Sequence, residues 1–341
     1  MAITPKQYKI YFTPRTGLNI YGNEQEVSGK ISEGGISSMK KSIDAADYDI
    51  GIFYYGDVTI RAINKNGALS EPKDFRSIFR YSRDLTKVRI EYNDVNGSVD
   101  VFNGLINEEA TRENFETNNI SFKVLSLDSV IRTTRIPNGA IINGVTFKSA
   151  LETILNKTDI TTILTYDSSK INPNLNLNID DGSKFDSIST RDGLSKLLIA
   201  SNSVFIINSS NEMIVQSRSE NSGGYTELYG PFSQKERSNI LKVSKYNNGK
   251  QRLFTVVKVG SQTKVQSNYL TDDGYRQKTI KLDFITNTDT QLSIAQNISN
   301  EFKFPKIELE VEVETSLAKN LDLLDKILID YPLRLKPETK F

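Results

Sequence analysis

Four glutamates at every second position, Glu308, Glu310, Glu312 and Glu314, form the most regular array of reactive groups in the sequence. Side chains two residues apart on a strand lie roughly 6.6–7 Å apart on one face. That distance is close to the carboxylate separation of inverting glycosidases. However, any half-buried strand with glutamates on its wet face has the same spacing. We therefore interpret the row first as a solvated face paired with lysines, Lys303 and Lys306 or those of a neighbouring strand. An acidic channel wall or a calcium-binding face is the functional alternative.

Two Asp-Asp-Gly triplets, at Asp180 to Gly182 and at Asp272 to Gly274, resemble the start of an ion-binding loop. Neither continues into the EF-hand pattern, which needs acidic or amide residues at positions one, three and five and a glutamate at position twelve. The triplets are therefore predicted to be turns.

Three further groups of residues are weak candidates for chemistry. The glycine pairs Gly34-Gly35 and Gly223-Gly224 lack the flanking residues of a phosphate-binding loop. Ser37 precedes Lys40 by three residues, but a serine–lysine dyad needs a helix start, and this segment is predicted to be extended. The run Phe53-Tyr54-Tyr55 could stack on sugars or bases, although core and interface roles are favoured. We predict no catalytic, cofactor-binding or metal-binding residue.

Composition excludes most kinds of catalysis. The 341 residues include no Cys, no His and no Trp. Thiol nucleophiles, disulfides, serine–histidine triads and zinc sites built on histidine are therefore excluded. Carboxylate chemistry and oxygen-ligand Mg²⁺ or Ca²⁺ sites remain possible.

Charge and hydropathy indicate a protein that does not insert stably into a membrane and does not grip nucleic acid. The net charge is only +1, from 43 Lys and Arg against 42 Asp and Glu, whereas sequence-independent nucleic-acid binding usually uses a basic stripe. The sequence shows neither a signal-peptide-like start nor a long apolar run. We expect the protein to be made and kept in the cytoplasm until it is released.

The first 135 residues are predicted to form mostly strands, because apolar and polar side chains alternate in short segments. These segments are Asp57–Ile63, Lys87–Tyr92, Ser98–Phe102 and Asn119–Leu127. Asn66-Gly67 predicts a turn. Asn96-Gly97 predicts a type I′ hairpin turn, because this pair readily supplies two positive φ angles. Several short strands at this spacing favour a barrel or a sandwich.

A small α/β unit is predicted after Pro137. Two segments with an apolar helical face, 146–156 and 190–200, predict helices, and Thr146 is a suitable N-cap. Between them, 172–181 is rich in Asn and Asp with alternating leucine and isoleucine, and predicts an exposed strand or arm. Residues 203–207 and 213–216 predict a hairpin.

Strands return after residue 224, together with one more helix. The predicted strands are 241–245, 254–259, 279–283, 307–314 and 326–331, and the predicted helix is 289–302. The fold class is therefore mixed, mainly β with an α+β insert. The predicted domains are 1–136, 137–222 and 223–341. The last is expected to be incomplete, because no closing element follows its final extended stretch.

Three stretches, taken in order, resemble the hub proteins at the tips of phage tails and of related contractile injection machines. They are Ser42–Asn66 with Lys87–Ile106, then Asn119–Thr133, and then Thr146–Arg218. In that family a first barrel carries a Phe-x-Gly-x-Ile strand, which Phe102, Gly104 and Ile106 match here. The third stretch is similar to the family's small middle domain.

The resemblance implies two barrels similar to the tail tube, at 1–136 and 223–341, flanking the middle domain. It also implies a homotrimer whose six barrels present a pseudo-sixfold ring to the tail tube or to a distal tail ring protein. A central spike would attach to the threefold face, and the tape-measure protein and then DNA would pass through the lumen. The protein would be part of the virion, without an enzymatic activity or a cofactor. Two alternatives stay open, a hexameric distal tail ring protein and a carbohydrate-active protein that uses a pair of carboxylates.

Overall fold

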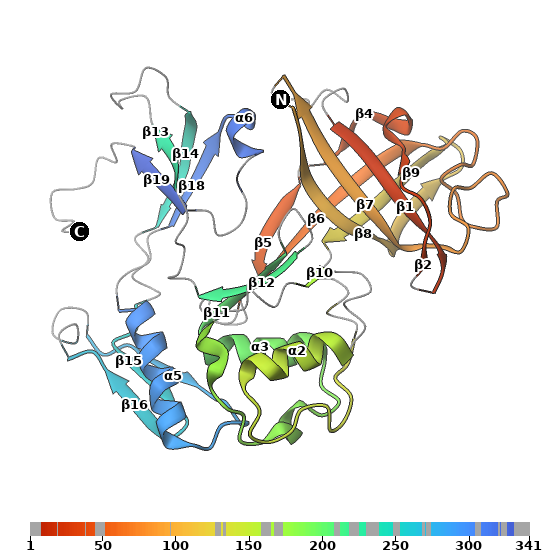
Figure 1. Cartoon of the computed structure of the whole chain (residues 1–341). Helices are drawn as coiled ribbons and strands as arrows, with labels where there is room; N and C mark the ends of the chain where they lie inside the picture. The colour runs from red at the N-terminus through yellow and green to blue at the C-terminus, as the bar shows by residue number, and fades with distance from the viewer. Residues whose placement is uncertain are drawn as a thin grey trace. The chain divides into compact units, whose positions relative to one another are not determined.

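The computed structural model in Figure 1 describes most of the chain. The described residues are 8–18, 20–37, 39–44, 52–95, 97–126, 131, 134–157, 165–166, 173–207, 212–217, 225–229, 239–247, 253–267, 270, 274–303, 308–319, 321 and 326–330. The chain divides into two compact units. Unit 1 is Met1–Ser217 with Leu282–Thr290, and unit 2 is Arg218–Lys281 with Gln291–Phe341.

Unit 1 contains one large, mostly antiparallel sheet. Its strands are β1 (Tyr8–Gly17), β2 (Ile20–Tyr21), β3 (Gln25–Glu26), β4 (Ile31–Ile36), β5 (Lys40–Asp44), β6 (Ile52–Ile63), β7 (Ser82–Asp94), β8 (Gly97–Asn114), β9 (Asn119–Ser126), β10 (Thr165–Tyr166), β11 (Ser203–Ile207) and β12 (Glu212–Ser217). The main path of hydrogen-bonded neighbours runs β10-β12-β11-β6-β9-β8-β7-β1-β2. The first residues of β6 therefore connect the β-rich part to the hairpin of β11 and β12.

The β-rich part of unit 1 closes into a barrel through one short segment. Residues 25–36 run from β3, which pairs with β1, through a 3-10 turn (η2, Ser28–Lys30) to β4, which pairs with β6. The Ser28 hydroxyl accepts a hydrogen bond from Ile10 N–H at 2.9 Å. Because β1 and β6 are the two edges of the sheet β1-β7-β8-β9-β6, this segment joins the edges. Closure removes exposed sheet edges.

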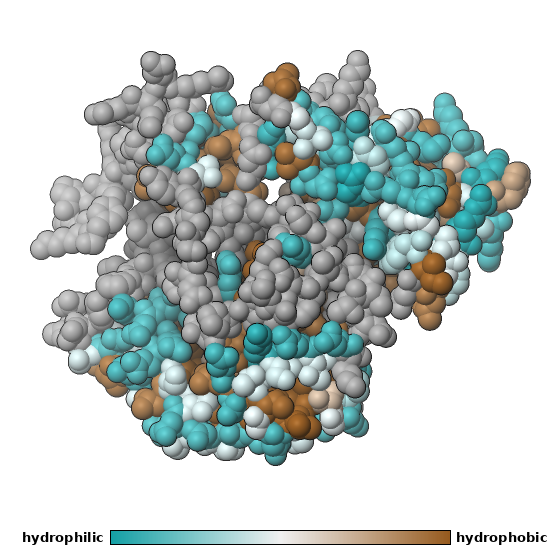
Figure 2. All heavy atoms as spheres, viewed as in Figure 1, coloured by the Kyte–Doolittle hydropathy of each residue, from teal (hydrophilic) through white to brown (hydrophobic). Residues whose placement is uncertain are grey.

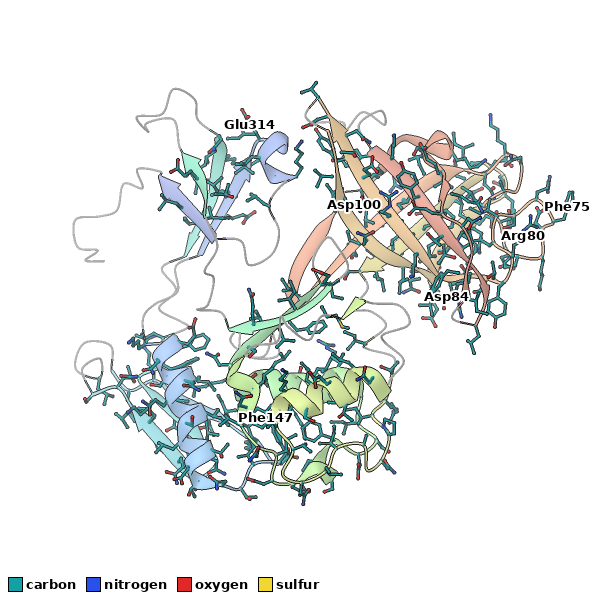
Figure 3. All side chains as sticks on the ribbon, viewed as in Figure 1. Phe75, Arg80, Asp84, Asp100, Phe147 and Glu314 are labelled. Atoms are coloured by element: carbon teal, nitrogen blue, oxygen red, sulfur yellow. The ribbon has the colours of Figure 1, made fainter. Side chains whose placement is uncertain are left out.

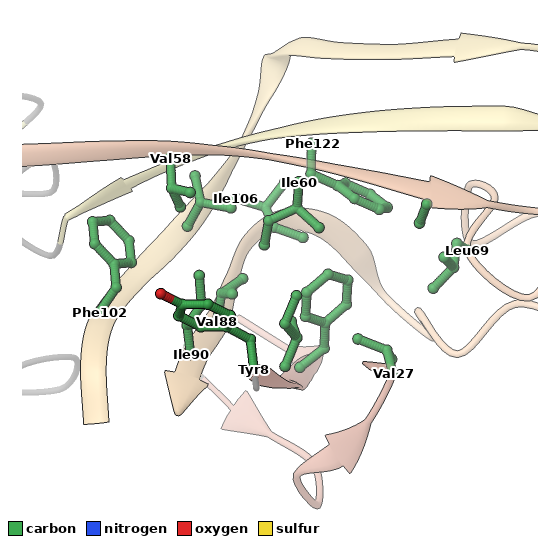
Figure 4. Close-up of a cluster of buried hydrophobic side chains, with 14 of the residues drawn as sticks. Tyr8, Val27, Val58, Ile60, Leu69, Val88, Ile90, Phe102, Ile106 and Phe122 are labelled. Carbon is green, nitrogen blue, oxygen red and sulfur yellow. The ribbon is translucent and has the colours of Figure 1, made fainter. Parts of the chain in front are cut away.

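The barrel interior is a continuous apolar core (Figure 4). Alternate positions of five strands supply it, as period-2 patterning requires. The buried residues on these strands are Tyr8, Ile10, Phe12, Val58, Ile60, Ala62, Val88, Ile90, Tyr92, Phe102, Ile106, Ile120, Phe122 and Val124. The predicted strands of this region are confirmed with their inward faces.

The strongest predicted hairpin is confirmed, but its turn is shifted. Asp94 pairs with Gly97, so Gly97 begins β8 instead of occupying the second central position of the turn. Its φ of +117° is one that a residue with a Cβ rarely adopts. The other predicted turn, Asn66-Gly67, is confirmed by the hydrogen bond from Gly67 N–H to the Asn64 carbonyl.

Two helices pack in the remainder of unit 1. Helix α2 (Phe147–Lys157) follows Thr146, whose hydroxyl accepts from Ser149 N–H at 3.1 Å, as the predicted N-cap requires. Helix α3 (Thr190–Ser201) begins after Ser189, whose hydroxyl accepts from Asp192 N–H. The predicted helices and the hairpin that follows them are confirmed.

The predicted exposed arm at 172–181 is wrong. Residues Pro173–Asn176 form a 3-10 turn (η5), and Leu175 and Ile179 are completely buried. Proline fixes φ near the helical value, which suits the start of such a turn. A second 3-10 turn, η6 (Gly182–Phe185), follows. Phe185 packs edge-to-face on Phe284, which also contacts Phe147.

Unit 2 contains the last elements of the chain. They are β13 (Tyr225–Tyr229), β14 (Ile240–Asn247), β15 (Val256–Val259), β16 (Gln262–Val265), β17 (Gln277–Ile280), α5 (Thr288–Glu301, of which the first three residues belong to unit 1), β18 (Glu308–Val313), α6 (Thr315–Ala318) and β19 (Lys326–Asp330). In the described part these strands form three small sheets, β13-β19, β14-β18 and β16-β15-β17. The mainly-β α+β fold class is confirmed, and closure of a second barrel stays a prediction.

Candidate functional site

The row of glutamates lies on β18, whose partner strand supplies lysines. Glu312 pairs in register with Lys242, and Glu310 pairs with Lys245. Along β18, Glu310 and Glu312 are exposed, while the alternating apolar residues Leu309, Val311 and Val313 are partly buried. Opposite charges across an antiparallel pair stabilise the pair modestly. This register supports the interpretation of a solvated face beside a strand that carries lysines.

Glu314, the last member of the row, lies where β18 ends and α6 begins (Figure 3). Its carbonyl oxygen accepts hydrogen bonds from the N–H groups of Leu317 and Ala318 in that short helix. The main chain of Glu314 thus takes part in the start of α6.

The first Asp-Asp-Gly triplet is a turn, as predicted. The Asp181 carboxylate caps η6 by accepting from Ser183, and these hydrogen bonds lower the pKa of Asp181. The Asp180 carboxylate accepts from Thr286 N–H at 2.6 Å and from Asn287 N–H at 2.7 Å. Both aspartates therefore hold main chain in place. The Asp272-Asp273 pair of the second triplet lies outside the described residues.

Ser37 takes part in the barrel wall. Its N–H donates to the Thr59 carbonyl, and its hydroxyl accepts from Thr59 N–H at 2.8 Å. Ser37 is thus bound to the edge of β6 in an extended segment, as predicted. Lys40 is the first residue of β5.

The other weak candidates fall on strands or outside the described part. Gly34 and Gly35 belong to β4, and a Cβ at Gly35 would meet the Arg61 carbonyl oxygen. Gly223-Gly224 lies outside the described residues. The run Phe53-Tyr54-Tyr55 lies in β6, where Phe53 pairs with Phe205 of β11.

The Phe-x-Gly-x-Ile strand is built into the barrel core. Phe102 and Ile106 are buried inside, and Gly104 faces β9. A Cβ at Gly104 would lie 2.4 Å from the Leu125 carbonyl oxygen. The glycine is therefore required by the close approach of β8 to β9.

Two wide bulges at one rim of the barrel gather a polar cluster that the sequence did not indicate. The pairing of β1 with β7 is interrupted between Arg15 and Thr13, and the pairing of β8 with β9 is interrupted between Asn107 and Arg112. Leu85, in the first bulge, has a φ of +59°, which is uncommon for a residue with a side chain.

Arg83 is the centre of this cluster. Its buried guanidinium pairs with Glu108 and, at 3.1 Å, with Glu113. The second oxygen of Glu113 accepts from Asn64 and from Ser70, each at 2.9 Å. The cluster thereby fixes the loop that connects β6 to β7. No spacing in the sequence signals it, because it depends on both bulges.

A second ionic network covers the outer face of the barrel, which is mostly hydrophilic on the visible side (Figure 2). Arg89 on β7 pairs with Glu24 at 2.8 Å, with Asp100 at 2.9 Å and with Glu91 at 3.0 Å. Its guanidinium also lies 4.0 Å from the ring centroid of Tyr11. The hydrogen bonds to Glu24, followed by those to Asp100 and Glu91, raise the pKa of Arg89. The network links β1, β7 and β8 from outside.

Within the described residues, no group of three or more acidic side chains could hold a metal ion. In the same part of the chain, no helix combines the length and the apolar character needed to cross a membrane. The side chains of the Arg83 and Arg89 clusters bind main chain and one another, and their charged groups could also contact another protein.

No protein-family model matches the chain, and no curated protein matches it. Solved structures of phage tail proteins are similar over almost its whole length. The tail protein from Neisseria meningitidis MC58 has a TM-score of 0.58 at 13% identity, with 95% of this chain and 86% of that chain covered.

Two prophage proteins give the same result. The 43 kDa tail protein of prophage MuSo2 from Shewanella oneidensis has a TM-score of 0.54 at 11% identity, covering 95% of this chain and 88% of its own. The tail protein gp18 from Listeria monocytogenes EGD-e has a TM-score of 0.53 at 10% identity, covering 90% and 82%. The resemblance found in the sequence is thus confirmed at the level of the fold: this chain has the fold of phage tail proteins.

Proposed function

We propose that this chain is a structural hub of a phage tail tip or baseplate. The observation that carries the proposal is the shared fold, which extends over 95% of the chain and over most of the length of two phage tail proteins. Fold alone does not fix function, so the chemistry of the candidate residues matters as well. The described candidates hold strands, turns and loops together, which suits a non-enzymatic, structural protein of the virion.

In this proposal, three copies form a ring with pseudo-sixfold symmetry. Each copy contributes the barrel of residues 1–136 and a second β-rich domain, 223–341, with the middle domain 137–222 between them. Closed rotational symmetry makes such an interface finite. The ring joins the tail tube, or a distal ring protein, to the central spike. The tape-measure protein and then DNA pass through the lumen, and assembly takes place in the host cytoplasm before release.

The mass in solution tests the proposal. The subunit has a mass of 38.4 kDa, so a trimer has three times that mass, about 115 kDa. We expect light scattering behind a sizing column, over a range of concentrations, to give the trimer. A hexamer, at six times the subunit mass, would instead indicate a distal tail ring protein.

A turnover assay on peptidoglycan and bacterial polysaccharide provides the complementary test. Any hydrolysis that is lost in Glu310→Gln or Glu312→Gln would overturn the structural role in favour of carboxylate chemistry. The hub proposal expects no turnover with either polymer.

A further inference from the structure

Two buried arginines lie on neighbouring strands at the bulged rim of the barrel, and only one of them is neutralised. Arg83 on β7 has a side chain that is 5% exposed and pairs with Glu108 and Glu113. Arg15 on β1 is 6% exposed. Among the described residues, no carboxylate pairs with Arg15. Its one hydrogen bond goes to the Asp84 carbonyl, at a long 3.4 Å, and its buried Nε has no acceptor.

A guanidinium has five N–H donors and is always charged. Burying such a cation without an anion is strongly unfavourable, and proteins normally pair it. The nearby Asp84 carboxylate makes no ion pair with Arg15, and its Oδ1 accepts from Glu108 N–H at 3.2 Å. The other polar neighbour, Tyr21, donates its hydroxyl to the Leu85 carbonyl. Arg15 is thus a largely buried cation that no carboxylate of the described residues neutralises.

Exposed apolar side chains lie on the same hairpin as Arg15 and next to its partner residues in the sequence. Arg15 pairs with Tyr21 of β2 and with Ser82 of β7. The residues just before these two partners are Ile20, which is 62% exposed, and Tyr81, which is 50% exposed. Leu18, at the tip of the same β1–β2 hairpin, is 72% exposed. The Arg15 guanidinium lies 5.3 Å from the Tyr81 ring centroid. We call Arg15, Leu18, Ile20 and Tyr81 the Arg15 patch.

We propose that the Arg15 patch is a docking site for a protein segment that presents a carboxylate between apolar side chains. The carboxylate completes the pairing of Arg15, and the flanking side chains cover Leu18, Ile20 and Tyr81. Arginine and tyrosine are among the residue types that dominate interface energetics. A charge-assisted pair that forms in a dry patch is also strong. This proposal stands whether or not the chain is a hub.

Nucleic acid does not fit the patch as well as a protein does. The loop between β6 and β7, which ends at Tyr81, carries acidic Glu71 and Asp74 among basic Lys65, Lys73, Arg76 and Arg80, and Arg76 is paired with Asp74. Phe75 and Arg80 of this loop lie at the outer end of the barrel in Figure 3. Acidic residues interrupt the basic ones, so this surface lacks the continuous basic stripe typical of nucleic-acid binding.

The first test uses stability and a matched pair of variants in the full chain. Arg15→Met removes an unpaired cation, so we expect its unfolding midpoint to stay the same or rise. Arg83→Met leaves the carboxylates of Glu108 and Glu113 without their cation, so the unfolding midpoint of this variant should fall by several degrees. If Arg15→Met lowers the midpoint as much as Arg83→Met does, Arg15 belongs to the protein's own network and the proposal is wrong.

The second test measures recognition directly. The probe is a capped pentapeptide with a central glutamate between two leucines, and the control peptide has glutamine in its place. We expect the glutamate peptide to shift the NMR resonance of the Arg15 Nε–H group and to bind at least tenfold more tightly than the control. Arg15→Met should abolish this preference. No shift at millimolar peptide, or equal binding of both peptides, would overturn the proposal.

Discussion

Gly104 determines how closely two strands of the barrel wall approach. It sits between the buried side chains of Phe102 and Ile106, and its missing side chain leaves room for the Leu125 carbonyl of β9. Both neighbours on the interior face are already in van der Waals contact with the core. An added methyl group has no direction in which to move, because the obstacle is main chain.

Gly104→Ala should therefore destabilise the barrel by about 1–3 kcal/mol, the usual cost of overpacking. Urea unfolding followed by tyrosine fluorescence would measure the change. The matched control is Gly29→Ala, where an added Cβ meets nothing within 4 Å and the effect should stay within about 0.5 kcal/mol. Equal effects of the two substitutions would show that the close strand approach is unimportant.

The positions of some single residues could be predicted from the sequence, and those of others could not. The alternation of apolar residues is enough to predict the inward positions of β6, β7 and β9, because a strand has only two faces. The pairing of Arg83 with Glu108 and Glu113 could not be predicted. Two bulges bring these residues together, and a bulge inserts residues without leaving a periodic signal.

At the level of an element, helix α3 has the buried face that its sequence predicts. Its apolar face, Leu194, Leu197 and Leu198, is fully buried, as the helical period predicts. Its first turn is closed reciprocally. Ser189 accepts from Asp192 N–H at 3.0 Å and donates its hydroxyl proton to the Asp192 carboxylate at 2.7 Å. Asp192 also places a negative charge at the positive end of the helix dipole.

Ser189→Ala should destabilise unit 1 by about 1 kcal/mol, because an orphan N–H group loses its acceptor. Thermal unfolding followed by circular dichroism would detect the change. Ser189→Thr should keep most of the stability, since threonine is also a good cap and retains the hydroxyl proton for Asp192. In the middle of the same helix, Ser195→Ala should be neutral or slightly stabilising. A neutral Ser189→Ala would mean that packing alone sets the start of α3.

The sequence pattern predicts an element wrongly where tertiary contacts override the local alternation of apolar and polar residues. Alternating Leu175, Leu177 and Ile179 suggested a strand, yet Leu175 and Ile179 insert into the core of unit 1 from a turn and a single bridge. The β-pattern of a short segment cannot reveal whether a partner strand is present. Conversely, β18 was predicted correctly, because its alternation extends over a whole strand with one polar face.

At the scale of the whole molecule, unit 1 is not continuous in sequence. The segment Leu282–Thr290 returns to it after unit 2 has begun. Phe284 is completely buried and contacts Phe147 and Phe185. Lys196 pairs with Asp283 at 2.9 Å. No sequence pattern indicated this return, because most of segment 282–290 connects a strand to helix α5 and has no period of its own.

A fragment that ends at residue 217 should therefore be less stable than unit 1 in the full chain. We expect a lower unfolding midpoint and stronger binding of a hydrophobic dye. In the full chain, Phe284→Ala should cost about 3–5 kcal/mol through the cavity it leaves. Thr288→Ala, at an exposed site of the same region, is the control and should stay within about 0.5 kcal/mol. A fragment as stable as the intact unit would contradict the role of Phe284.

The return of Leu282–Thr290 also has a consequence for the timing of biosynthesis. Ribosomes add about 5–20 residues per second, so Phe284 is made roughly 3–13 s after Ser217. During that interval, Phe147 and Phe185 lack their contact with Phe284 and stay exposed to water. A nascent chain at this stage is an attractive client for a chaperone, and rare codons between positions 218 and 281 would lengthen its exposure.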